Sequence, residues 1–196
     1  MLMPVSTQCL RPALLCPPQP LLVHMLISPF GMSNTGNLYG LLFNSRSIVN
    51  KLSELHYLLY CTSQDIFVIT ETWLHDDIMS SLLDPKGLFT VIRKDRVVSR
   101  GGGVCVLVRK PLRVIGIDLG NEFDDLEMIC FDLILTGFFA IYRPPGYDSD
   151  ALGYMCKLVK CLTRLENTKY PNTILGDVNL PKANWNNFLV QVMLFM

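Results

Sequence analysis

The sequence has few charged side chains, no net charge and no long uninterrupted apolar run in its N-terminal segment. Its 17 basic and 17 acidic residues cancel, so the chain as a whole has no electrostatic attraction for nucleic acid or for an anionic membrane. The longest apolar stretch near the N-terminus, residues 21–27, is interrupted by His24. Because a membrane-spanning helix needs about 20 apolar residues, this stretch cannot span, and no membrane partner is expected.

Cysteine and histidine clusters of the kind that bind zinc are also missing. The chain has seven cysteines without a CxxC pair, and its three histidines lie near no cluster with ligand spacing. Most of the cysteines fall in apolar runs, which is typical of buried, reduced thiols. The sequence therefore predicts an intracellular protein, nuclear or cytoplasmic.

The first 36 residues differ from the rest of the chain. No formal charge occurs from Pro12 to Ser45, and four prolines interrupt residues 17–29. A signal peptide is the alternative interpretation, but its apolar region would be short and flanked by prolines. We expect a disordered or poorly packed extension over residues 1–36, a domain over residues 37–185, and an apolar tail over residues 186–196.

The middle of the chain alternates apolar strand-like runs with helical periodicity. A helix is predicted from an N-cap at Ser47 to about Thr62, and a second helix around residues 152–162. Thr136 and Gly137 predict a tight hairpin between two strands. Strands are predicted over residues 38–44, 65–70, 104–110, 127–135, 138–142 and 173–175. This order favours a layered α/β fold in which helices cover sheets.

Polar side chains stand where four of these runs end, at Asn44, Glu71, Tyr142 and Asp177. Asn179 follows two residues later, and on an extended chain it would point the same way as Asp177. A single carboxylate after a strand is often a turn or cap residue. If all of these side chains converge, however, their hard oxygen atoms suit magnesium better than zinc.

Five sequence blocks resemble one family of nucleases. They are FNSRSIVNKL (43–52), ITETWL (69–74), RGGGVCVLVRK (100–110), YRPPG (142–146) and GDVNLP (176–181). In this order they resemble the endonuclease domain of non-LTR (LINE-type) retrotransposons, which belongs to the exonuclease–endonuclease–phosphatase superfamily together with AP endonucleases and deoxyribonuclease I. The resemblance implies an α/β fold, a four-layered α-β-β-α sandwich of two mixed sheets flanked by helices.

The same resemblance implies roles for the strand-end residues in Mg²⁺-dependent cleavage of a DNA phosphodiester, with Mn²⁺ as the alternative metal and no small-molecule cofactor. Glu71 would be the principal metal ligand, with Asn44 beside it. Asp177 would orient and activate the attacking water. Asn179 and Tyr142 would contact the scissile phosphate.

A basic segment begins between the second and third blocks and ends just after the third. Residues 93–113 hold seven of the 17 basic side chains. The resemblance places this hairpin region near the phosphate backbone of the target DNA, with contacts from Arg93, Lys94, Arg96 and Arg100. The alternative is a solvated hairpin whose charges protect a strand edge. The glycines at 101–103 precede a strand rather than a helix, so they are not a dinucleotide fingerprint.

The resemblance does not extend over the whole family pattern. That pattern continues to a second aspartate and a Ser-Asp-His block, whereas this sequence has no histidine after His75. We therefore expect a C-terminally truncated nuclease with impaired activity. Two alternatives stay open: a non-catalytic remnant that at most binds nucleic acid or protein, and a phosphodiesterase for lipid or inositol phosphates. The basic segment and the TETWL block count against the latter.

Overall fold

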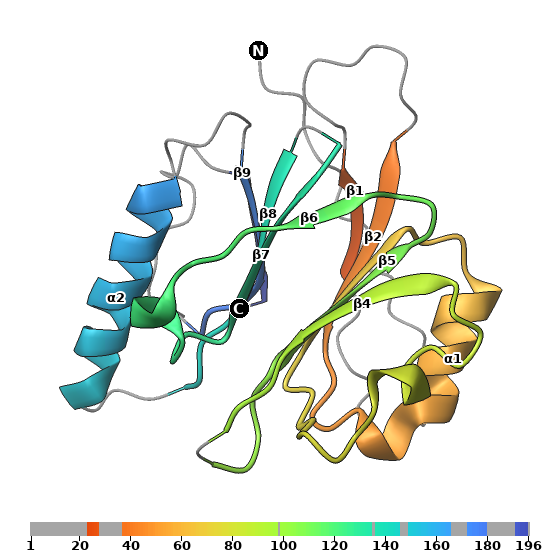
Figure 1. Cartoon of the computed structure of the whole chain (residues 1–196), viewed down its shortest axis with the longest axis horizontal. Helices are drawn as coiled ribbons and strands as arrows, with labels where there is room; N and C mark the ends of the chain where they lie inside the picture. Colours follow the sequence, from red (N-terminus) through yellow and green to blue (C-terminus); the bar gives the residue numbers. More distant parts are fainter. Residues whose placement is uncertain are drawn as a thin grey trace, which may run out of the picture.

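The computed structural model describes residues 23–27, 37–97, 99–134, 136–145, 149–165, 172–179 and 191–195 of the chain. Two five-stranded sheets pack face to face. Helix α1 (Leu52–Cys61) covers the outer face of one sheet, and α2 (Ser149–Leu165) covers the outer face of the other (Figure 1). The predicted α-β-β-α sandwich is therefore confirmed.

The first sheet has the strand order β1-β2-β3-β5-β4. Only β2 and β3 are parallel neighbours, and the other pairs are antiparallel. Every residue of β3 is buried, because α1 covers one face of this central strand and the second sheet covers the other. The strand bounds are Val23–Ile27 (β1), Leu38–Asn44 (β2), Ile66–Thr70 (β3), Phe89–Lys94 (β4) and Val104–Arg109 (β5).

The second sheet has the strand order β10-β9-β8-β7-β6. Its β8, β9 and β10 run parallel, whereas β6, β7 and β8 are antiparallel, so this sheet is mixed as well. The bounds are Val114–Gly116 (β6), Met128–Leu133 (β7), Thr136–Tyr142 (β8), Asn172–Asp177 (β9) and Gln191–Phe195 (β10). Three 3-10 helices lie in the described connections, at Val49–Lys51 (η1), Ser80–Leu82 (η2) and Asn121–Phe123 (η3).

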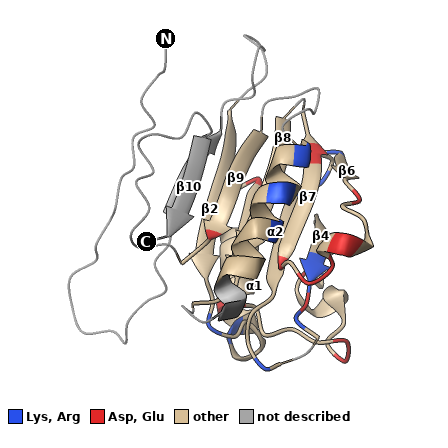
Figure 2. Cartoon of the chain, turned by 90° about the vertical axis from the view of Figure 1, so that its left-hand side faces the viewer, with Lys and Arg blue, Asp and Glu red and all other residues tan. Residues whose placement is uncertain are grey.

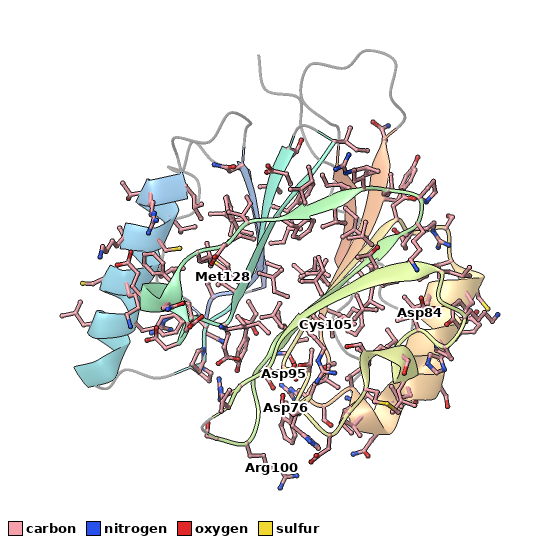
Figure 3. All side chains as sticks on the ribbon, viewed as in Figure 1. Asp76, Asp84, Asp95, Arg100, Cys105 and Met128 are labelled. Atoms are coloured by element: carbon pink, nitrogen blue, oxygen red, sulfur yellow. The ribbon has the colours of Figure 1, made fainter. Side chains whose placement is uncertain are left out.

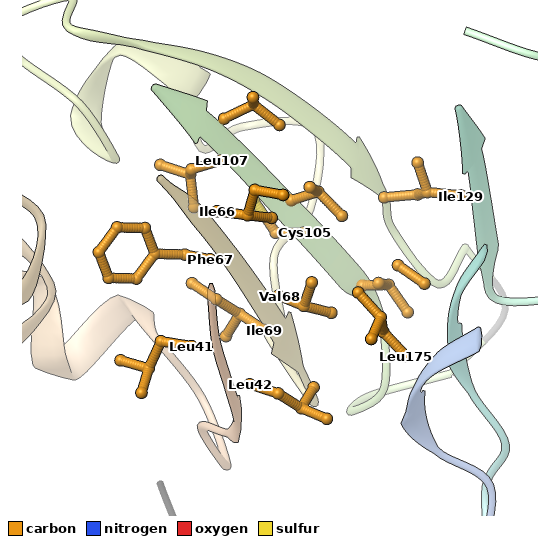
Figure 4. Packing of buried hydrophobic residues seen from close by; sticks show 14 of the residues in the cluster. Leu41, Leu42, Ile66, Phe67, Val68, Ile69, Cys105, Leu107, Ile129 and Leu175 are labelled. Carbon is orange, nitrogen blue, oxygen red and sulfur yellow. The ribbon is translucent and has the colours of Figure 1, made fainter. Parts of the chain in front are cut away.

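The main apolar core lies between the two sheets. This core includes Val68 of β3 together with Ile129 and Leu175 of the second sheet (Figure 4). A smaller cluster beneath α2 includes Leu158. In the described part of the chain, no helix is both long and apolar enough to cross a membrane.

The predicted N-cap at Ser47 is wrong. The first helical turn is η1, and α1 follows from Leu52 with no side-chain cap at either start. Ser47 has a left-handed backbone (φ 78°), and its N–H donates to the carbonyl of Glu71 at 2.9 Å. The backbone of Ser47 is thus bonded to the residue that follows β3, and Ile48 is the residue at the helix start.

The predicted hairpin is confirmed, since β7 and β8 pair antiparallel, but its turn is not at Thr136 and Gly137, because both residues belong to β8. The turn lies earlier, at Ile134, which has φ 47°. Gly137 pairs with Asp132 on one side and Asn172 on the other. A Cβ at this glycine would overlap the Asn172 side chain, so the glycine makes room within the sheet rather than forming a turn.

Four strands have no counterpart in the sequence prediction. Strand β1 lies within residues 1–36, the segment expected to pack poorly, and pairs with β2; β10 lies within the expected apolar tail. Strands β4 and β6 are the other two. Most of residues 1–36 and 186–196 lies outside the described residues, and the three-part division of the chain stays a prediction.

Gly176 in β9 is a position where the fold requires glycine. Its φ is 149°, and a Cβ would overlap the carbonyl oxygen of Ile141 and lie 2.8 Å from its carbonyl carbon. The close neighbour that leaves no room for a side chain here is the adjacent strand β8.

Gly176→Ala is therefore expected to lower the free energy of unfolding by at least about 2 kcal/mol, through overpacking and backbone strain. Urea unfolding followed by circular dichroism measures this loss. The matched variant is Gly153→Ala in α2, where a Cβ meets nothing within 4 Å, and alanine in a helix should be neutral or stabilising. Equal stabilities of the two variants would contradict the steric argument.

Candidate active site

Four polar side chains from both sheets meet where β2, β3, β8 and β9 end. The parallel register pairs Asn44 with Thr70, and Tyr142 with Asp177, so these strands end together in pairs. The Asn44 Nδ2 donates to Glu71 Oε1 at 2.8 Å and to Asp177 Oδ2 at 3.1 Å. One amide group therefore bridges two carboxylates that lie 106 residues apart in the sequence (71 and 177).

Tyr142 completes this group from the second sheet. Its hydroxyl donates to Glu71 Oε1 at 3.1 Å. Glu71 Oε1 thus accepts two hydrogen bonds, from Asn44 and Tyr142, whereas no described residue donates to Glu71 Oε2. The carboxylate is fixed through one oxygen while the other stays available.

The backbone around Glu71 is held in a left-handed conformation (φ 51°) by its neighbours. The Ser45 hydroxyl and the Ser47 N–H both donate to the Glu71 carbonyl, each at 2.9 Å. Ser45 is 1% exposed, and only its place directly after Asn44 marks it in the sequence. These contacts fix the direction of the Glu71 side chain.

Asn179 lies beside the group, but its side chain turns elsewhere. Its backbone has φ 46°, so the chain is not extended there, and the expectation that Asn179 points with Asp177 is wrong. The side-chain Nδ2 donates to the Arg143 carbonyl at 2.6 Å, and the backbone N–H donates to Asp177 Oδ1 at 3.3 Å. Asn179 therefore positions Asp177, and its contact with a phosphate stays a prediction.

Burial shapes the protonation of this group. Desolvation raises the pKa of the Asp177 carboxyl above its usual value, the nearby Glu71 charge adds to this, and the hydrogen bonds from Asn44 and Asn179 oppose it. Desolvation, together with the charge and hydrogen bond of Glu71, also raises the pKa of Tyr142. Tyr142 therefore keeps its proton at neutral pH and remains a donor.

Asp177→Asn is expected to raise the melting temperature at pH 7 by a few degrees. The raised folded-state pKa of Asp177 means that its contribution to stability is complete below the unfolded pKa and is lost as the pH rises through the folded pKa. The gain over the wild type should disappear below about pH 4. Thermal unfolding in EDTA measures it, with Asp76→Asn, at an exposed position, as the control. A lower melting temperature for Asp177→Asn at pH 7 would contradict this sign.

An ion pair between the two sheets, formed by Arg96 and Glu127, adjoins this group of four side chains. Arg96 binds the Glu127 carboxylate through Nε at 2.7 Å and through Nη2, and the Gly103 N–H donates to the same carboxylate. The Glu127 carbonyl accepts the Tyr142 N–H at 2.9 Å. A Cβ at Gly102 would overlap both Arg96 and Glu127. The glycine-rich RGGGV block therefore makes room for this Arg96–Glu127 pair.

The four basic residues predicted to contact DNA have different environments. Arg93 is paired with Asp95 and donates to two carbonyls, and Arg96 is paired with Glu127. Lys94 lies 3.3 Å from Asp124 and is partly exposed. Arg100 is exposed and lies over the Trp73 ring at 5.2 Å. Their contacts with DNA stay a prediction.

Other basic side chains are used within the fold. Arg109 donates to the carbonyls of Leu59 and Thr62 at the end of α1 and to that of Gln64. The basic residues of α2 lie beside acidic residues of the η3 region (Figure 2). These pairs make the surface around α2 electrically mixed.

The central group consists of Asn44, Glu71, Tyr142 and Asp177. Its donor atoms fit magnesium better than zinc. Among the residues described, no three His, Cys, Asp or Glu side chains are grouped so that they could hold a metal ion. Glu71 and Asp177 supply carboxylates on either side of the Asn44 amide. Mg²⁺ commonly takes only one or two carboxylates from a protein and keeps several waters, and Glu71 Oε2, to which no described residue donates, could supply one of them.

The comparisons with known proteins show the fold. No family model and no curated protein sequence matches the chain. Similar structures include the 3′ phosphatase NExo from Neisseria bound to a product DNA hairpin (20% identity, TM-score 0.57, covering 72% of this chain and 57% of that one). They also include AP endonucleases from Archaeoglobus fulgidus (19%, TM-score 0.55, 74% and 59%) and from Leishmania major (15%, TM-score 0.57, 79% and 61%). This chain thus spans about three fifths of the length of these neighbours.

Proposed function

We propose that this chain is a Mg²⁺-dependent phosphodiesterase that nicks DNA, of the kind found in non-LTR retrotransposons. The observation that carries the proposal is the hydrogen-bonded group of Asn44, Glu71, Tyr142 and Asp177 at the ends of four strands. The fold shared with AP endonucleases supports it, as do the five sequence blocks that resemble the retrotransposon domain.

The residues suit hydrolysis by an in-line water. The Asp177 carboxylate accepts a proton from the water as its oxygen bonds to phosphorus, and the bond from phosphorus to the leaving sugar oxygen breaks. Tyr142 keeps its proton and donates to a non-bridging phosphate oxygen. Glu71 would hold the metal, and Mg²⁺ bound there would supply positive charge to the developing oxyanion. Asn44 holds the Glu71 and Asp177 carboxylates in place through its two hydrogen bonds.

The proposal includes slow turnover by the 196-residue chain. Of the histidines with described side chains, His56 bonds to the Leu82 carbonyl and His75 lies beside Asp77, so neither contacts the central group. No described group beside Asp177 is an evident acid for the leaving oxygen. A missing acid–base group lowers the rate by about 10² to 10⁴.

The test is a plasmid-nicking assay with the full chain in Mg²⁺, in Mn²⁺ and in EDTA. Slow conversion of supercoiled DNA to nicked circles, abolished by EDTA, is the expected result. A parallel assay with phosphoinositide vesicles tests the lipid alternative, and hydrolysis there without DNA nicking would overturn the proposal. DNA binding without metal-dependent cleavage would instead favour the non-catalytic module.

A further inference from the structure

Arg143 is a buried arginine in the YRPPG block, directly after Tyr142 at the end of β8. The residue is 5% exposed. An arginine keeps its positive charge at any ordinary pH, and a buried charge is costly unless other groups bind it. Its place beside the candidate active site is therefore explained by the atoms that it holds.

Arg143 and Asn179 bind each other in both directions. The Arg143 Nη1 donates to the Asn179 backbone carbonyl at 3.1 Å, and the Asn179 Nδ2 donates to the Arg143 carbonyl at 2.6 Å. The Arg143 backbone N–H donates to the Asp177 carbonyl at 2.8 Å. These hydrogen bonds, which we call the Arg143–Asn179 clamp, join the end of β8 to residues 177–179 at the end of β9.

The clamp acts on one oxygen of the Asp177 carboxylate. The Asn179 N–H donates to Asp177 Oδ1 at 3.3 Å, whereas Asn44 donates to the other oxygen, Oδ2. The Asn179 backbone is left-handed (φ 46°), a conformation that the surrounding structure must maintain in a residue other than glycine. Since Arg143 bonds to both the carbonyl and the side chain of Asn179, it fixes the direction in which the Asn179 N–H points.

Helix α2 holds the clamp from the other side. The Tyr154 hydroxyl donates to the Tyr142 carbonyl at 3.1 Å, and this carbonyl shares one planar peptide unit with the Arg143 N–H. Burial and the Glu127 charge raise the pKa of Tyr154, and the nearby Arg143 charge opposes this. The Arg143 guanidinium thus lies beside a buried phenol, and the backbone of Arg143 is fixed by bonds at both ends of its peptide unit.

We propose that Arg143 is a positioning residue for the reaction, which acts through Asn179 to hold Asp177 Oδ1 where the carboxylate accepts a proton from the attacking water. The inference rests on the proposed function and assigns a role to the arginine of the YRPPG block. Because Arg143 is buried, it acts through the protein and not by contact with DNA. Displacement of a reacting group by about 1 Å costs about 10² in rate.

The kinetic test is plasmid nicking by the full chain in Mg²⁺. Arg143→Met is expected to lower kcat by about 10- to 100-fold and to change KM by less than about twofold, because it displaces a reacting carboxylate but removes no substrate contact. Arg143→Lys keeps a donor for the Asn179 carbonyl and should recover most of the loss. A wild-type kcat in Arg143→Met would overturn the inference.

Arg109→Met is the matched control, because Arg109 also donates to backbone carbonyls, those around the end of α1. Its strand partner Phe89 bonds to Asp84. Figure 3 shows Asp84 on the opposite side of the molecule from Met128, which lies beside the end of β8. Arg109→Met should lower the melting temperature by several degrees but leave kcat unchanged. Equal losses of kcat in Arg109→Met and Arg143→Met would show that Arg143 serves folding alone.

Amide hydrogen exchange, followed by NMR in EDTA without DNA, tests the clamp independently of activity. The Asn179 N–H bonds to Asp177 Oδ1, and in Arg143→Met it should exchange about tenfold faster than in the wild type. The amide of Leu175, a buried residue of β9, should keep its protection. Exchange of the Asn179 amide at the wild-type rate in Arg143→Met would contradict the clamp.

The outcomes also distinguish this inference from the proposed function. If the Asn179 exchange depends on Arg143 but neither the wild type nor any variant nicks DNA, the clamp is confirmed and the nuclease proposal fails. If the wild type nicks DNA and Arg143→Met does so with the same kcat, the nuclease proposal stands and the positioning role is wrong.

Discussion

Glu71→Gln is expected to lower Mg²⁺-dependent nicking of plasmid DNA by about 10² to 10³-fold. The variant keeps the size of the side chain and the acceptor for Asn44 and Tyr142, but it removes the negative charge that holds the metal. Loss of one preorganised electrostatic group at a transition state costs about this much in rate. The measurement is the rate of nicking by the full chain over a range of Mg²⁺ concentrations.

The matched control is Asp76→Asn, an exposed carboxylate outside the central group. It should nick DNA at the wild-type rate. Because Glu71 and Asp177 lie on either side of one amide, removing the Glu71 charge should also relieve repulsion and leave the melting temperature equal or higher. Wild-type nicking by Glu71→Gln would show that the observed activity does not come from this site.

The strand ends could be predicted because they are local features of the sequence. Runs such as residues 65–70 are apolar on both faces, and a polar residue at the end of such a run needs an explanation. Asn44, Glu71, Tyr142 and Asp177 stood out on this ground, and the parallel pairing of β2 with β3 and of β8 with β9 brings them together.

The features that could not be predicted from the sequence depend on contacts with residues far away along the chain. Gly137 has the local signature of a turn, but its role is set by the Asn172 side chain of a neighbouring strand. Ser47 has the signature of a helix cap, but its N–H is held by Glu71. Strand β4 was missed because its half-exposed residues, including Arg93 and Lys94, break the apolar pattern. Charge density alone likewise failed to show that Arg93 is paired with Asp95.

Arg96→Met is expected to lower the free energy of unfolding by about 3–5 kcal/mol, because it leaves the Glu127 carboxylate buried without its cation. The Glu127 side chain is 9% exposed. The double variant Arg96→Met/Glu127→Gln should recover most of the loss, since a neutral amide still accepts the Gly103 N–H. Urea unfolding of the three proteins measures the coupling, and a double variant no more stable than Arg96→Met would contradict the pairing.

The Arg96–Glu127 pair also explains why position 102 in the glycine-rich block must be glycine. Gly102→Ala places a Cβ in overlap with both partners of the ion pair, whereas a Cβ at Gly101 meets Trp73 and Arg96 only at ordinary contact distances of 3.6–4.0 Å. Both glycines have left-handed backbones, at φ 68° and φ 95°, so strain affects both variants. The additional loss in Gly102→Ala therefore measures the ion pair. The Glu127 carbonyl also accepts the Tyr142 N–H. Gly102→Ala should therefore lower DNA nicking more than Gly101→Ala does. Equal losses of stability and of nicking in the two variants would show that the glycines serve the turn alone.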